Sequence, residues 1–305
     1  MVSEFVCLNT SNYSFSPFPC QTFNICVYYY TENWVGRIMS RIIIRHYRIA
    51  LPRKVPKPTA PIRIVVIGDL HNRTFGKGNR NLVEQIVGQH PDLIFSVGDL
   101  TVCKPGKETN IDVAVSLLKR LSCECPVYCI NGNHEFRAKR YPDAYDGVYE
   151  QFKRGIHTSN IRLLEDEKER IDIKGTHLTV HGFELPEKYY KRFHQQYISA
   201  EEIRKSIQKP EEGRYNILLA HNPVYFEGYA LWGADLTLSG HLHGGLMRLP
   251  LVGGVISPQV KLFPKYDCGM YEKYGRKLLV TAGLGSHSIA FRINNPAEFM
   301  LVELY

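Results

Sequence analysis

Residues 62–69, IRIVVIGD, decide the fold class of this 305-residue chain. The segment is a short run of β-branched residues that ends in Gly-Asp, a pattern typical of a buried strand followed by a tight turn. Two later segments repeat it: PDLIFSVGD at residues 91–99 ends in the same dipeptide, and PVYCINGNHE at residues 126–135 ends in Gly-Asn-His-Glu. We therefore predict three strands in this part of the chain.

Amphipathic segments separate these predicted strands. Leu82 and Ile86 lie at helical spacing in the first segment, and Val113, Leu117 and Leu121 do so in the second. An alternation of strand and helix implies parallel neighbouring strands with right-handed crossovers. The carboxyl ends of such strands meet at one edge of the sheet, where binding sites form.

The second half of the chain also alternates between the two kinds of segment. Helices are predicted near residues 144–154 and 199–208, and a tight turn at Lys174-Gly175 joins two sheet-forming runs. Further strands are predicted in IRLLED, YNILLAHNP, ADLTLSGHLH, KLLVTAGLG and FMLVELY. The pattern indicates an α/β (α+β) fold.

A change of character near residue 60 predicts two parts. Residues 1–60 form an irregular basic N-terminal extension, and residues 61–305 form the domain. Seven Lys or Arg residues lie between positions 37 and 57 with no acidic residue among them, which leaves about +3 of the net charge of +8 to residues 59–305. Residues 37–58 therefore contact an anionic membrane surface or form a solvated arm. Specific binding of nucleic acid is not expected from so small a domain charge.

Targeting signals are absent from the pattern of apolar residues. No run approaches the 18 or so apolar residues of a membrane-spanning helix, and the first 30 residues lack the pattern of a signal peptide. We expect a cytoplasmic protein, at most peripheral to the membrane. The eight cysteines show no paired CxxC spacing, which favours reduced, mostly buried thiols.

Ligand-type side chains gather at the predicted strand ends. Residues two apart in an extended segment project to the same side, so Asp69 with His71, and His241 with His243, can serve one cavity. Carboxylate, imidazole and amide groups without thiolate suit divalent Mn, Fe or Zn better than Ca²⁺ or an iron–sulfur cluster. The candidate ligands are Asp69, His71, Asp99, Asn133, His221, His241 and His243.

Seven candidates are too many for one four-coordinate ion but suit two ions that share a carboxylate. Two ions about 3.5–4 Å apart lower the pKa of a bridging water and clamp the oxygens of an in-line phosphoryl displacement. The sequence thus predicts phosphoester hydrolysis by attack of a metal-bridging hydroxide.

The ordered motifs resemble those of the calcineurin-like metallophosphoesterase superfamily over residues 62–305. They are Asp69-x-His71, Gly98-Asp99, Gly132-Asn133-His134-Glu135, His221 and Gly240-His241-x-His243. The ending, with SGHLHGG, FPKYDCGMY and AGLGSHSIAFRINNPAE, resembles the YkuE/YaeI-like bacterial phosphodiesterase branch. The resemblance implies a four-layer αββα sandwich of two mixed β-sheets flanked by helices.

The resemblance also implies roles for individual residues. One metal ion would be held by Asp69, His71 and His243, and a second by Asn133, His221 and His241, with Asp99 bridging them. His134 would be the catalytic residue beside the phosphate, where it stabilises developing charge or protonates the leaving oxygen.

The expected activity is that of a phosphodiesterase acting on a small or lipid-like phosphoester. The alternatives are a phosphomonoesterase or protein phosphatase of the same fold, and a metal-binding scaffold without catalysis. Asn72 and Arg73 are candidates for phosphate contact. His181 and His287 are weaker candidates for the pocket wall, with packing roles preferred.

Overall fold

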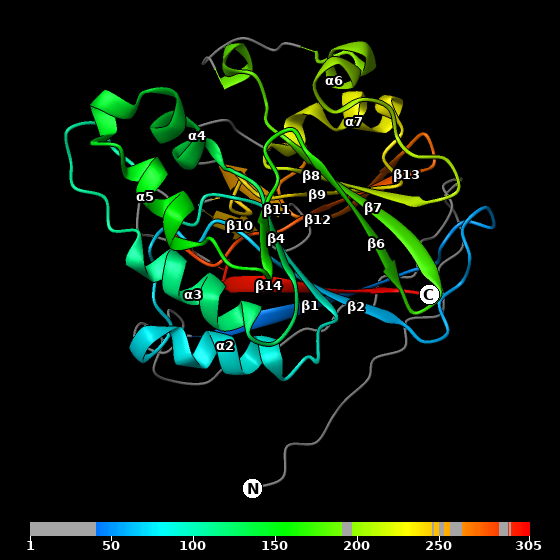
Figure 1. Ribbon diagram of the computed structural model, residues 1–305, viewed down its shortest axis with the longest axis horizontal. Coiled ribbons are helices and arrows are strands. Elements are labelled where there is room, and N and C mark those ends of the chain that lie inside the picture. The colour runs from blue at the N-terminus through cyan, green and yellow to red at the C-terminus, as the bar shows by residue number, and fades with distance from the viewer. Residues whose placement is uncertain are drawn as a thin grey trace, which may run out of the picture. The chain divides into compact units, whose positions relative to one another are not determined.

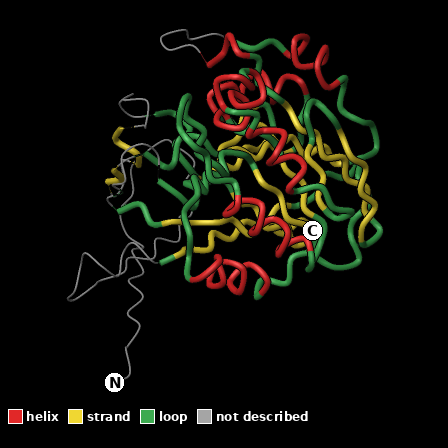
Figure 2. Tube along the Cα trace, turned by 60° about the vertical axis from the view of Figure 1, so that its left-hand side comes forward, coloured by secondary structure: helices red, strands yellow, loops and turns green. Residues whose placement is uncertain are grey.

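Two six-stranded sheets dominate the computed structural model, which describes residues 41–190, 197–245, 247–249, 253–256, 264–286, 292 and 294–305. These residues belong to one compact unit, Val35–Tyr305. Both sheets are visible between the helices in Figure 1, and Figure 2 shows the strands and helices from a second direction.

The first sheet contains the three strands predicted from the Gly-Asp and Gly-Asn segments, side by side and parallel. A fourth parallel strand follows, and the C-terminal strand joins the sheet antiparallel to β2. In spatial order the strands are β1 (Ile42–Ile49), β14 (Ala297–Leu304), β2 (Ile62–Ile67), β3 (Leu93–Ser96), β4 (Val127–Cys129) and β5 (Ile161–Leu163).

The second sheet is also mixed. Its β6–β7 hairpin turns at Lys174 and Gly175, which have φ of 50° and 77°, so the predicted tight turn is confirmed. In spatial order the strands are β12 (Gly269–Lys273), β13 (Arg276–Val280), β9 (Leu236–Ser239), β8 (Tyr215–Ala220), β7 (Thr176–Phe183) and β6 (Lys168–Ile173). A separate two-stranded sheet contains β10 (Met247–Leu249) and β11 (Gly253–Ile256).

Helices cover the outer face of each sheet, as Figure 1 shows with α2 and α3 below and α6 and α7 above. The helices predicted near residues 81, 113, 148 and 200 are present. Two short helices, α4 and α7, were not predicted. The α-helices are α2 (Arg80–Val87), α3 (Asp112–Ser122), α4 (Asn133–Arg140), α5 (Val148–Gly155), α6 (Ala200–Ile207) and α7 (Phe226–Trp232).

Three hydrophobic clusters define the layers. Along β2, Val65 and Ile67 pack in the cluster under the helices of the first sheet, whereas Ile64 and Val66 pack in the cluster between the sheets. Alternate residues of a strand face opposite sides, so each strand contributes to two clusters. The third cluster lies between the second sheet and α6 and α7, and includes Trp232. The expected four-layer αββα sandwich is confirmed.

The boundary predicted at residue 60 is wrong for residues 42–49. This segment forms β1, which pairs in parallel with β14, and Ile42 and Ile49 are buried. Arg45 and Arg48 of β1 form ion pairs with Glu298 and Glu303 of β14, so their charges are partly balanced within the sheet. Residues 50–60 of the predicted extension form turns and loops after β1, with Leu51 and Val55 buried, and residues 1–40 lie outside the described part. Within that part, no helix is long and apolar enough to cross a membrane.

Candidate metal centre

The candidate ligands converge where strands of both sheets end. Asp69, Asp99 and Asn133 follow β2, β3 and β4, whereas His221 follows β8. His241 and His243 follow β9, and His71 lies two residues after Asp69. All seven side chains, and that of His134, are buried. The structure therefore brings together every residue of the site that the sequence predicts.

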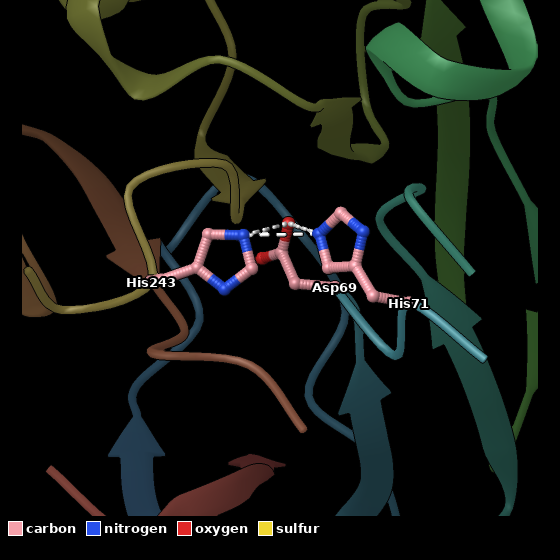
Figure 3. A group of neighbouring side chains, drawn as sticks. All are labelled: Asp69, His71 and His243. Atoms are coloured by element: carbon pink, nitrogen blue, oxygen red, sulfur yellow. Dashed lines mark hydrogen bonds and ion pairs between the residues drawn. The ribbon is translucent and has the colours of Figure 1, made fainter. Parts of the chain in front are cut away.

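The first group is Asp69, His71 and His243, drawn in Figure 3. The Nε2 atoms of the two imidazoles are 3.0 Å apart. Asp69 Oδ1 lies 3.6 Å from His243 Nε2 and 4.0 Å from His71 Nε2. Three ligand-type atoms thus point to one place, and they are the three residues expected to share an ion.

The second group is Asp99, His221 and His241. His221 Nε2 lies 3.2 Å from Asp99 Oδ2 and 3.2 Å from His241 Nδ1. One end of the Asn133 amide lies 2.8 Å from His241 Nδ1 and 3.2 Å from Asp99 Oδ2. The second expected ligand set is therefore also assembled.

Asn133 provides a test of whether this group suits a cation. With its NH₂ at the inner end, the amide donates to the imidazole and the carboxylate. With its oxygen there, acceptor groups alone face one another, and a positive ion satisfies them. An amide rotates between these two states without moving its neighbours. The donor set fits a divalent transition-metal ion.

Asp99 lies between the two groups. Its Oδ2 is 3.2 Å from His221 Nε2 and 3.8 Å from His71 Nε2. Its other oxygen, Oδ1, accepts a hydrogen bond of 2.8 Å from the backbone N–H of His134. One carboxylate oxygen therefore faces imidazoles of both groups, which is the position that a bridging ligand requires.

The loops reach this arrangement through unusual backbone geometry. Asp69, His71, Asp99, His241 and His243 all have φ between 49° and 72°. Side chains other than glycine rarely adopt positive φ, and such strain of about 1–3 kcal/mol per residue concentrates at functional sites. The prediction that paired residues sit on extended segments is therefore wrong, because tight left-handed turns, not alternation along a strand, aim them.

Two glycines allow the loops to approach this closely. A Cβ atom at Gly98 would lie 2.3 Å from the backbone nitrogen of Gly132, and Gly98 has φ of +92°. A Cβ atom at Gly240 would lie 2.4 Å from Asp69 Oδ2. Any side chain at either position would push apart two loops that carry ligands.

Residues that the sequence analysis left without a role hold the ligands in place. The Glu135 carboxylate accepts backbone N–H bonds of 2.9–3.0 Å from Asp99, Thr101 and Gly132. Glu135 is the third residue of α4, so a glutamate three residues after the N-cap Gly132, whose N–H it accepts, was the available signal. Asn295 donates to the carbonyl of His243 at 2.6 Å, and nothing in the sequence indicates this contact between distant segments.

A backbone carbonyl group orients the imidazole of His221. Its Nδ1 lies 2.7 Å from the carbonyl oxygen of Val97, which leaves Nε2 to face Asp99. Proteins orient histidine ligands of metal ions in this way.

The centre concentrates buried charge. Burial raises the pKa of Asp69 to about 7, against the attraction of His221. Burial also opposes ionisation of Asp99, but the histidines around it outweigh burial and hold its pKa well below the usual range. Burial lowers the pKa of His221, yet Asp99 outweighs it and raises that pKa to about 9. Cations at this position would relieve the repulsion between the two buried carboxylates.

His134 lies at the edge of the cluster. Its Nδ1 is 3.0 Å from the carbonyl oxygen of Cys103, and its ring packs edge-on against His71 with centroids 5.2 Å apart. A ligand atom of His134 lies within 4.8 Å of those of His71 and Asp99. The side chain is therefore near enough to act on a group bound at the centre.

The weaker candidates have other surroundings. Arg73 donates to the carbonyl of Leu284 at 3.1 Å and stacks over Phe75. His181 is fully buried, where it contacts Asn216 and packs edge-on against Trp232, so a packing role holds for it. The Asn72 side-chain oxygen is buried without a hydrogen bond from the described residues. His287 lies outside the described residues.

Comparison with known proteins agrees with this geometry. The model of the calcineurin-like phosphoesterase family matches residues 62–245. An uncharacterized metallophosphoesterase of Aquifex aeolicus is 26% identical, over 82% of this chain and 87% of its own. YkuE of Bacillus subtilis is 23% identical, over 82% and 81%. Phosphodiesterase YaeI of Escherichia coli is 25% identical, over 80% and 83%. The resemblance to this branch is confirmed, and the chain belongs to the calcineurin-like phosphoesterase family.

Proposed function

We propose that the chain is a phosphodiesterase that depends on two divalent metal ions. Membership of the family and the grouped ligands support phosphoester hydrolysis. The observation that carries the finer proposal is the position of Asp99, whose Oδ2 lies 3.2 Å and 3.8 Å from imidazoles of the two groups. A carboxylate in that place can serve two ions at once.

Each group would hold one ion of Mn, Fe or Zn. Asp69, His71 and His243 would bind the first and Asn133, His221 and His241 the second, with Asp99 contributing to both. When bound, two such ions lower the pKa of a shared water and neutralise charge on the oxygens of an in-line phosphoryl displacement. The buried side chains exclude bulk water from this position, which strengthens every charge interaction there.

His134 would act on the phosphate. Its backbone N–H donates to Asp99, and its Nδ1 is engaged by Cys103. Its imidazole, which packs edge-on against His71 at the edge of the cluster, would donate to a phosphate oxygen or give a proton to the leaving oxygen. Loss of the imidazole should therefore lower turnover more than substrate binding.

A diester is the favoured substrate because YaeI, which matches over 80% of this chain, is named a phosphodiesterase. A small or lipid-like diester fits the expectation from the sequence. The rival within the same fold is a phosphomonoesterase or protein phosphatase, and the rival outside catalysis is a metal-binding scaffold.

The test is a comparison of two reporter substrates on purified, Mn²⁺-loaded protein. Bis(p-nitrophenyl) phosphate should be hydrolysed at least about tenfold faster than p-nitrophenyl phosphate in kcat/KM, and chelation should abolish both reactions. If the monoester is hydrolysed faster, the chain is a phosphomonoesterase and not a phosphodiesterase. If the protein binds metal but hydrolyses neither substrate, the alternative of a metal-binding scaffold without catalysis is supported.

A further inference from the structure

A cavity of about 200 Å³ lies beside α4. Phe136, Arg137 and Tyr141 line it from the helix and the residue that follows, and Glu187 and Tyr190 line it from the 3₁₀-helix η3 (Glu187–Tyr190). None of these residues belongs to the two ligand groups.

The cavity is one helical turn from the metal centre. Phe136 and Arg137 follow Asn133 by three and four residues on α4, so all three share one face of the helix. Arg137 also follows His134 by three residues. The α4 wall of the cavity therefore adjoins the position expected for the phosphate.

Aromatic rings form most of the lining. Those of Phe136 and Tyr190 lie with centroids 5.5 Å apart, tilted by 33°. The third ring, Tyr141, is 46% exposed and donates its hydroxyl to Glu187. Such a lining offers flat apolar surfaces with polar groups at the rim, which is what a planar heterocycle requires.

The charges of the cavity favour an anionic neighbour. The Glu187 carboxylate is already engaged by the Tyr141 hydroxyl, and Arg140 Nε lies 3.7 Å from it. The exposed Arg137 guanidinium has no hydrogen bond or ion pair with the residues that the structure describes. A guanidinium in that state can donate to a phosphate oxygen or to a ring carbonyl.

We propose that this cavity binds the planar aromatic ring of a nucleotide-type phosphodiester, with Arg137 beside the phosphate end. The inference rests on the proposed function, because the phosphate of the same ligand would occupy the metal centre. An engineered cavity of about 150 Å³ holds benzene, so this one holds a single ring. Bases bind proteins by stacking on aromatic side chains in this way.

The experiment measures binding without turnover. Thymidine 5′-phosphate and 2-deoxyribose 5-phosphate share the sugar and the phosphate and differ in the base, so the ratio of their Kd values reports the cavity alone. Titration calorimetry on the full, Mn²⁺-loaded chain should give a ratio of at least about ten in favour of thymidine 5′-phosphate. Phe136→Leu, which keeps an apolar side chain without the ring, should bring the ratio to near one.

Two further variants guard against a simple loss of folding. Tyr141→Ala should also lower the ratio. Its matched control is Tyr274→Ala. Tyr274 is another exposed tyrosine, lies in the turn between β12 and β13, and donates its hydroxyl to Glu227 of α7. This control should leave the ratio unchanged. Equal affinities in the unmodified chain, or a ratio that Phe136→Leu does not alter, would overturn the inference.

Other outcomes separate the cavity from the chemistry. If hexyl phosphate binds more tightly than thymidine 5′-phosphate, the cavity takes an aliphatic group and the inference is wrong. If bis(p-nitrophenyl) phosphate is hydrolysed but no ring preference appears, the inference fails and the proposed function stands. If the ring preference appears but no diester is hydrolysed, the proposed function fails and the cavity assignment stands.

Discussion

The metal centre and the cavity beside α4 share one helix, yet they are built in opposite ways. The centre is made of buried side chains on left-handed turns, fixed by hydrogen bonds from behind. The cavity is lined by rings that are partly exposed and by a guanidinium that no described group holds. Catalysis requires ligand side chains in fixed positions, whereas the residues that select among substrates can be substituted without loss of the reaction. Changes at the centre should therefore affect all substrates, and changes at the cavity only some.

The largest effect is expected at the carboxylate that both groups share. Asp99→Asn keeps the shape and removes the charge, so kcat should fall at least about a thousandfold for every substrate. Steady-state kinetics with two diesters would measure it, and circular dichroism would check the fold. A fall that spares one diester would place Asp99 in selection rather than in chemistry.

A smaller effect is expected at Glu135, which holds the backbone of the ligand loops in place. Glu135→Gln weakens three backbone contacts that position Asp99 and the start of α4. Affinity for Mn²⁺ should fall by about 10–100-fold, the usual effect of removing a group that orients a ligand. Competition with a chelating dye measures it, and activity should return at high Mn²⁺. Unchanged affinity would mean that Glu135 only caps the helix.

At the cavity the effect should depend on the substrate. Arg137→Gln should raise KM for thymidine 5′-(p-nitrophenyl phosphate) by about tenfold or more, because a hydrogen bond to a charged group contributes about 1.5–3 kcal/mol. Arg137→Lys should recover part of the loss through its charge. Arg80→Gln, an exposed arginine paired with Glu84 on α2, is the control that should change nothing. A fall in kcat rather than a rise in KM would contradict the assignment.

The smallest effect concerns the anchoring of α4. Lys139 of this helix contacts Glu165 and Glu184, and Lys153 also contacts Glu165. Burial opposes ionisation of Glu165, but hydrogen bonds from Lys139, Lys153 and Tyr149 outweigh it and lower its pKa to about 2. Because the folded pKa is lower than the ordinary 4.5, the stabilisation is present above pH 4.5 and is lost as the pH falls towards 2.

Glu165→Gln should therefore lower the free energy of unfolding by about 1 kcal/mol at pH 7, since solvent screens part of this network. The difference from the unmodified chain should disappear near pH 2. Urea unfolding at several pH values measures it. A difference that is the same at all pH values would show that the charge of Glu165 contributes nothing.

The sequence identified side chains that the structure brings together, because most of them follow a strand with a strong local pattern. The run IRIVVIGD and its two relatives indicate strands, and strand ends converge by topology alone. It failed for β1, because pairing Ile42 with Ala297 joins segments about 250 positions apart and leaves no local signal. It failed for the cavity for the same reason, since only tertiary packing brings Phe136 to Tyr190.

The central claim is that Asp99 joins two separate ion sites, and metal content of single-ligand variants tests it most directly. Protein dialysed against Mn²⁺ and analysed by plasma mass spectrometry should hold about two ions per chain. His243→Ala and His241→Ala should each hold about one ion. Anomalous scattering from crystals of the two variants should show that each has lost a different ion. A single ion in the unmodified chain, or loss of both ions in either variant, would contradict the account.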